Sequence, residues 1–171
     1  MELPAGRCTL RPFRPADAPS LARHANNRRV WRNLRDAFPH PYTPADAEWY
    51  IARVAGQSPV TTFAVDVGGE AVGGMGFKLG TDVERFSAEL GYWLGEAHWG
   101  RGVTTAAVAA VTAYAFRDLG LLRVFALPFA RNLASARVLE RAGYQLEGTL
   151  RRSAVKDGEV LDQRLYAALR P

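Results

Sequence analysis

The feature that most constrains the fold is an uncharged run of fifteen residues, Gly102 to Phe116, which lies between Arg101 and Arg117. This run is too short to cross a bilayer, because a membrane-spanning helix needs about 20 apolar residues. Alanine and valine recur almost all round the helix that it predicts, from about residue 103 to residue 119. A helix of this kind is deeply buried. The rest of the chain must therefore supply the layers that cover it.

Strand and helix patterns surround this helix. Gly68-Gly69 separates two strand patterns and predicts a hairpin. The run Leu90 to Leu94 is apolar and aromatic, and we expect it to be buried on both faces. The order predicts an α/β chain with a mixed sheet and no internal repeat. The expected strands cover 9–13, 61–67, 70–79, 85–94, 121–127, 144–155 and 160–169, and an irregular stretch covers 26–45. The expected helices cover 17–25, 43–54, 103–119 and 132–143, and Asp17, Thr43 and Asn132 are the expected N-terminal caps of the first, second and fourth.

Composition narrows the class of protein. A chain of 171 residues favours a single domain, and 48% hydrophobic with 23% charged residues excludes disorder and low complexity. The net charge of +5 mildly favours an anionic partner such as a phosphorylated cofactor, RNA or an acidic protein. Cys8 is the single cysteine, which excludes an intrachain disulfide, favours a cytoplasmic location and is expected to be structural. Three scattered histidines offer no zinc motif. Glu2, Pro4 and Arg7 stand where a signal peptide would need an apolar core.

A loop from Gly95 to Gly102 opens the buried helix. Free N–H groups and the positive end of the helix dipole gather at such a site, Gly100 and Gly102 allow a phosphate to approach the backbone, and Arg101 adds charge. A plain strand-to-helix turn explains the glycines equally well. A dinucleotide site is disfavoured, because the run from Gly100 to Thr105 lacks the third glycine and no acidic residue ends the next strand.

Two further segments carry polar side chains. Glu89 lies in an aromatic strand, where a carboxylate is unusual and is able to act as a general base; on its own, however, an ion pair with an arginine is the simpler interpretation. Asn132 and Ser135 fit ordinary helix capping.

Together these segments resemble the GNAT N-acetyltransferase superfamily, and within it the RimJ/RimL-like branch of ribosomal-protein N-terminal acetyltransferases. The resemblance covers nearly the whole chain. It implies a mixed, mostly antiparallel sheet of about seven strands, with helices on both faces and a splayed central strand pair, over residues 1–171 as one acetyltransferase domain. The residues that carry it are Leu10 to Phe13 with Asp17, Ala88 to Leu94, Trp99 to Ala107, Asn132 and Ser135, Arg141 to Tyr144, Glu147-Gly148, Asp162 and Tyr166.

The resemblance also implies acetyl-CoA as co-substrate and no metal. Glu89 is the expected base near the acceptor amine. Many members have, at the position of Leu139, a tyrosine that acts as the acid for the leaving thiolate. By resemblance to the RimJ/RimL-like branch, Ser135 takes this role here. The family usually has Gln or Arg at the position of Trp99 and Gly or Ala at the position of Thr104, so both residues depart from its pattern. The residues expected to bind acetyl-CoA are Trp93, Leu94, Trp99, Gly100, Arg101, Gly102, Val103, Thr104 and Asn132.

The acceptor is expected to be a peptide or protein N-terminal α-amine. At pH 7 a lysine costs about 3.5 kcal/mol more to neutralise than an α-amine. The region from Asn26 to Tyr50 should line the acceptor side, with Trp31, Phe38 and Tyr42 in contact. Small amines such as antibiotics or polyamines, or a non-catalytic acyl-CoA sensor, remain as alternatives. Two exposed final strands are compatible with a homodimer. The basic residues Arg28, Arg29 and Arg32 are compatible with binding of an acidic peptide or RNA, and equally with a basic surface that contacts only solvent.

Overall fold

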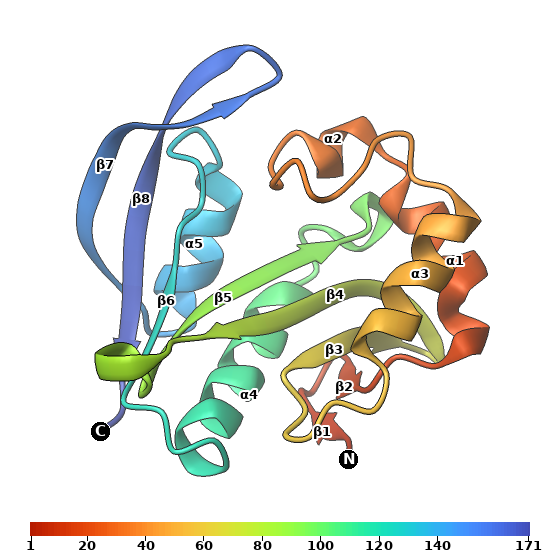
Figure 1. Ribbon diagram of the computed structural model, residues 1–171, viewed down its shortest axis with the longest axis horizontal. Coiled ribbons are helices and arrows are strands. Elements are labelled where there is room, and N and C mark those ends of the chain that lie inside the picture. The colour runs from red at the N-terminus through yellow and green to blue at the C-terminus, as the bar shows by residue number, and fades with distance from the viewer.

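The computed structural model describes residues 1–171 and contains one eight-stranded sheet in the order β1-β2-β3-β4-β5-β6-β8-β7 (Figure 1). Only β5 and β6 pair in parallel, so the predicted mixed, mostly antiparallel sheet is confirmed. The sheet has one strand more than the seven expected, because two residues before the first predicted strand also pair. The strands are β1 (Leu3–Pro4), β2 (Thr9–Arg11), β3 (Thr62–Val67), β4 (Glu70–Leu79), β5 (Ser87–Leu94), β6 (Arg123–Ala126), β7 (Gln145–Lys156) and β8 (Glu159–Leu169).

Helices cover both faces of the sheet, as expected. Successive residues of a strand point to opposite faces. Phe63 and Val65 of β3 pack in the large core beneath α4, whereas Ala64 packs with α1 and α3 on the other side. The expected irregular stretch contains a single helical turn, α2. The helices are α1 (Ala18–Ala25), α2 (Arg28–Trp31), α3 (Pro44–Val54), α4 (Val103–Arg117) and α5 (Leu133–Arg141).

The buried helix of the sequence is α4. Its residues Ala107, Val108 and Val111 are fully buried under the sheet. Thr112 is buried too, and its hydroxyl bonds the Val108 carbonyl and the Tyr144 hydroxyl, each at 2.7 Å. No helix of the structure is both long and apolar enough to span a membrane.

Buried charged side chains link β2 to β3 and to the turn that follows β2. Arg11 on β2 donates to Asp17 at 2.8 Å and to Asp66 on β3 at 2.7 Å. Asp17 also accepts from the N–H of Arg14 at 2.7 Å. Its side chain therefore caps the short turn Pro15–Asp17 rather than α1, which corrects the expected cap. Cys8 is buried beside β2, where burial raises the pKa of its thiol to about 11.

The parallel strands β5 and β6 separate after three pairs. Ser87, Ala88 and Glu89 oppose residues 123–125, and beyond Glu89 the strands have no shared register. The expectation that residues 90–94 are buried on both faces is wrong. Gly91 is exposed and Tyr92 is only half-buried, because they border the gap that opens between the strands. The predicted splayed central pair is thus present.

Candidate active site

A cleft of about 940 Å³ occupies the gap between β5 and β6. Residues of β4 and β5, the segment after α2 and the start of α5 line it. A Cβ added at Gly91 would meet nothing within 4 Å, so the backbone of β5 is open to a ligand there. The predicted site residues that line this cleft are Glu89, Trp93, Leu94, Trp99, Gly100, Thr104, Asn132, Ser135, Phe38 and Tyr42.

The alternation of β5 gives the cleft two chemically different sides. Leu90 and Leu94 point into the core around α4, and Tyr92 packs on that side. Trp93 packs on the opposite side, against the core of α1 and α3. Glu89 shares the side of Trp93, because residues two or four apart on a strand share a face. A molecule that runs along the gap therefore meets a carboxylate on one side and a phenol on the other.

The loop before α4 has the geometry of an anion site. Gly100 and Gly102 have φ values of +70° and +75°, and Gly102 is the N-cap of α4 without a side-chain cap. The first amides of the helix therefore have no partner from the chain. Arg7 approaches Gly102, with its Nε 3.4 Å from the position of an added Cβ. Arg7 is thus a second arginine near this loop, and it comes from a segment of the sequence not expected to contribute to the site.

Trp99 fastens the loop to the sheet. Its indole N–H donates to the Leu94 carbonyl at 2.7 Å, which ties the loop to the end of β5. Arg29 lies over the indole, 5.7 Å from the ring centroid, and pairs with Glu96. The tryptophan that departs from the family pattern thus has a structural role in shaping the loop.

Glu89 is held in an ion pair with Arg35. The Glu89 side chain is 19% exposed and the Arg35 side chain 64%. Lys78 of β4 stands directly opposite Glu89 in the antiparallel register, so its side chain leaves the same face. Arg35 was not among the expected site residues, since no local pattern links it to a residue 54 positions away.

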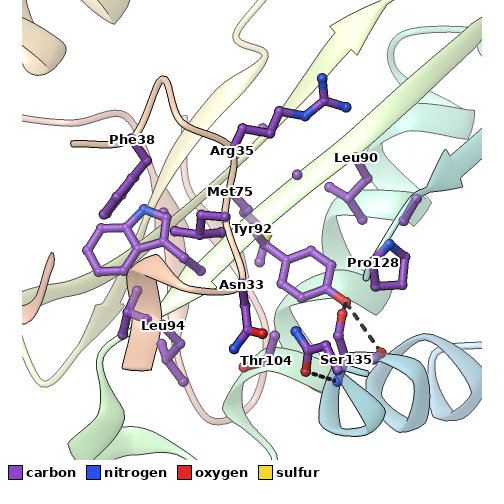
Figure 2. Close-up of a pocket in the computed structure, with 18 of the residues that line it drawn as sticks. Asn33, Arg35, Phe38, Met75, Leu90, Tyr92, Leu94, Thr104, Pro128 and Ser135 are labelled. Carbon is purple, nitrogen blue, oxygen red and sulfur yellow. Dashed lines mark hydrogen bonds between the residues drawn. The ribbon is translucent and has the colours of Figure 1, made fainter. Parts of the chain in front are cut away.

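Ser135 and Tyr92 form a hydroxyl pair at the start of α5. The two hydroxyl oxygens are 2.6 Å apart, and Figure 2 shows Tyr92 reaching from β5 to Ser135. Burial raises the pKa of Tyr92 to about 12, and the hydrogen bond with Ser135 opposes this rise. Asn132 caps α5 as predicted, because its Oδ1 accepts from the N–H of Ser135 at 3.2 Å. Tyr92 lines the cleft as well, although it was not among the residues expected there; its place three residues after Glu89 was the available signal.

The aromatic residues expected on the acceptor side divide into two groups. Phe38 lies against Trp93, with ring centroids 5.4 Å apart, and borders the cleft (Figure 2). Tyr42 is buried, with its ring centroid 4.9 Å from that of Phe38, and also lines the cleft. Trp31 does not line the cleft: it stacks near His40 and under the ammonium of Lys156, which is 3.8 Å from its ring centroid.

Comparison with known proteins agrees with this geometry. Residues 7–145 match the family model described as the acetyltransferase (GNAT) domain. The chain belongs to the GNAT acetyltransferase family. Its splayed strands β5 and β6 and the loop before α4 are thus those of a GNAT domain.

Individual GNAT relatives resemble the chain over different lengths. A probable N-acetyltransferase of Bacillus subtilis (strain 168), YjcK, is 44% identical over 85 residues, which cover 50% of this chain and 47% of that protein. The chain spans about half the length of the curated relatives it matches. RimL, a ribosomal L7/L12 alpha-N-protein acetyltransferase solved with coenzyme A, has a TM-score of 0.86 and 19% identity over 99% of this chain and 98% of its own. RimJ of Mycobacterium smegmatis, solved with a CoA-disulfide, has a TM-score of 0.85 and 27% identity over 99% of this chain and 86% of its own.

Proposed function

We propose that residues 1–171 form one acetyltransferase domain that transfers an acetyl group from acetyl-CoA to a peptide or protein N-terminal α-amine. The observation that carries the proposal is the gap between β5 and β6, with Glu89 on one side and the Tyr92–Ser135 pair on the other. The relatives named RimL and RimJ support it, and the first of these is described as an alpha-N-protein acetyltransferase.

The residues of the cleft fit acetyl-CoA, which supplies an activated thioester when bound. The free amides that follow Gly102 suit the pyrophosphate, and Arg7 and Arg101 add positive charge beside them. The open backbone at Gly91 and the cleft beside Trp93 and Leu94 suit the extended pantetheine arm. Asn132 lies where its amide is able to bond this arm while its oxygen caps α5.

Glu89 acts as the base for the attacking amine. An α-amine has a pKa of about 7.7 to 8, so a sizeable fraction is neutral at pH 7 and a single carboxylate suffices to take the remaining proton. Phe38 and Trp93 form the apolar wall beside this carboxylate. They exclude water from the attack and leave Glu89 as the group that accepts the proton.

Charge that develops on the acetyl oxygen is met by backbone N–H groups. Past Glu89, β5 has no neighbour on its β6 side, so its outward amides are unpaired along the cleft. The pairing of Trp93 and Leu94 with Gly74 and Gly73 on the β4 side holds the strand in place and so preorganises the outward donors.

The hydroxyl pair acts on the departing sulfur. In the proposed arrangement Tyr92, which keeps its proton at neutral pH, is the donor of the pair. The Ser135 hydrogen is then free to point at the sulfur. A hydrogen bond to the developing thiolate is sufficient. A free thiol has a pKa of about 8.5, so its thiolate is already a fair leaving group.

An assay of free-thiol release from acetyl-CoA tests the proposal. Peptides with free α-amines, the same peptides with a blocked N-terminus and one lysine, and polyamines are offered separately. Fastest release with free N-termini supports the proposed acceptor. Efficiency at least tenfold higher on lysine peptides or polyamines refutes the acceptor and leaves the acetyltransferase activity standing. Acetyl-CoA binding without turnover on any amine would instead favour an acyl-CoA sensor.

A further inference from the structure

The base of the proposed reaction is already occupied by a cation of the same chain. The guanidinium of Arg35 pairs with Glu89, and the Arg35 side chain is largely exposed whereas Glu89 is mostly covered. The pair engages Oε1 of the carboxylate, so the guanidinium already neutralises the charge of the base. An amine that approaches Glu89 must therefore replace the guanidinium or share the carboxylate with it.

Two contacts anchor the chain on either side of Arg35, whereas the Arg35 side chain is largely exposed. Asp36 pairs with Lys156 at 2.8 Å, and Lys156 is fully buried between that carboxylate and the Trp31 ring. The Arg32 carbonyl accepts from Arg131 at 2.8 Å. The tip of the β7–β8 hairpin and the loop before α5 thus hold this segment in place over the cleft. Arg35 is a long side chain on a rigid support, which suits a group that exchanges one partner for another.

The charges that face the cleft favour an acceptor that brings its own anion. Four charged side chains line it, and the carboxylate of Asp46 is engaged by the backbone and hydroxyl of Thr43. Glu89 is left with two cations around it, Arg35 and Lys78. Most α-amines carry a positive charge at pH 7. An acceptor with no anion adds a third cation to this group, whereas an acceptor with a carboxylate offers Arg35 a replacement for Glu89.

We propose that Arg35 is a specificity residue that selects an acceptor with a carboxylate close to its amine. The inference rests on the proposed function, because it takes Glu89 as the base. The guanidinium moves from Glu89 to the carboxylate of the acceptor, and Glu89 is then free to accept the proton of the amine. Arg35 touches Glu89 directly, so the two acceptor groups must lie within about two residues of one another, at about 3.5 Å per residue. The acceptor class is a peptide with aspartate or glutamate at its first or second position.

Matched acceptors test this inference. Two peptides differ only in Glu or Gln at position two, and a second pair differs in Asp or Asn at position one. For the wild-type protein, kcat/KM is expected to be at least tenfold higher with the acidic member of a pair. In Arg35→Gln this preference falls to within twofold, while acetyl-CoA affinity and Tm are unchanged. The preference of the wild type also declines between 50 and 500 mM salt, since the exposed contact is screened.

Arg151→Gln is the matched control. Arg151 is an exposed residue of β7 that does not line the cleft, so the variant loses the same charge elsewhere. It is expected to keep the full preference for acidic peptides. Equal wild-type efficiency within each pair overturns the inference, and so does a preference that survives in Arg35→Gln; both results leave the proposed α-amine acetylation intact.

Failure of the proposed function gives a different result. To distinguish it from failure of the inference about Arg35, the panel also contains glutamate α-amide and glutamine α-amide as small acceptors. Turnover on these alone refutes the peptide acceptor, and the ratio between the two amides then decides the role of Arg35. Absence of turnover on every amine, with acetyl-CoA binding retained, overturns both proposals.

Discussion

The hydroxyl of Tyr92 lies 2.6 Å from Ser135 Oγ, joining the middle of β5 to the first turn of α5. Because burial holds the pKa of Tyr92 at about 12, the phenol is a hydrogen-bond donor at every pH at which the protein is expected to work. Many GNAT members have a tyrosine that acts as the acid at the position of Leu139. In this chain the Tyr92–Ser135 pair supplies a donor beside the cleft instead. The acid function that we propose for Ser135 thus involves a residue 43 positions earlier in the chain.

Removal of either hydroxyl should impair the same step. Tyr92→Phe and Ser135→Ala are each expected to lower kcat about tenfold or more with acetyl-CoA affinity retained. The double variant should lose little beyond the more severe single one, because groups that act as a unit are not additive. Steady-state kinetics of the four proteins measures this. Additive losses would show that the two hydroxyls act independently.

Helix capping and catalysis are separable at this site. The cap uses the N–H of Ser135, which alanine retains, and the side chain of Asn132. Asn132→Ala is therefore expected to lower the free energy of unfolding by about 1 kcal/mol, and Ser135→Ala by much less. Urea denaturation of both variants compares them. An equal loss in Ser135→Ala would mean that its hydroxyl stabilises the helix.

The loop before α4 should respond to a negative charge. Gly102→Glu places a carboxylate at the helix N-terminus, where the pyrophosphate is proposed to bind, and should weaken acetyl-CoA binding by at least tenfold in calorimetry. Gly56→Glu is the control, because Gly56 has a similar φ of +71° and open space around it. The control should share the backbone strain but bind acetyl-CoA normally. Equal affinity of the two variants would place the pyrophosphate elsewhere.

The buried pair of Arg11 and Asp17 is expected to contribute to the stability of the fold toward acid. Burial raises the pKa of Asp17, but hydrogen bonds from Arg11 and the Arg14 N–H outweigh it and leave the pKa lowered. A lowered pKa stabilises the fold above the unfolded value of about 3.9, and this contribution is lost as the pH falls below it. Asp17→Asn should cost about 3 kcal/mol at pH 7, because Arg11 keeps its charge in a buried position.

Urea denaturation at pH 7 and pH 3 measures how the contribution of Asp17 to the free energy of unfolding changes with pH. The difference between wild type and Asp17→Asn should narrow at pH 3. Glu2→Gln breaks the exposed pair with Arg14 and should cost less than about 1 kcal/mol at either pH. A difference that grows toward pH 3 would contradict the assignment to Asp17.

The parts of the fold that local signals encode were predictable. The hairpin at Gly68-Gly69 and the cap at Thr43 follow from residues within four positions of one another, and the structure has both. The buried α4 follows from its uncharged composition, although it ends at Arg117, two residues before the expected end. A two-residue strand such as β1 has no periodicity to detect.

The contacts that define the site were not predictable, because they join distant segments. Arg35 reaches Glu89 only because the β7–β8 hairpin holds its loop over β5. Trp31 was expected in the acceptor site for its aromatic character, and the structure uses it to cover Lys156 instead. An aromatic residue signals burial against something, but the partner is set by the tertiary arrangement.

The most direct test of the account combines mass spectrometry with Glu89→Gln. The wild-type protein, acetyl-CoA and a peptide with both a free α-amine and a lysine are mixed, and the modified nitrogen is located. We expect one acetyl group on the α-amine, with kcat lowered about 10²-fold to 10⁴-fold in Glu89→Gln and acetyl-CoA binding retained. An acetyl group on the lysine, or a Glu89→Gln protein within a few-fold of wild type, would contradict it.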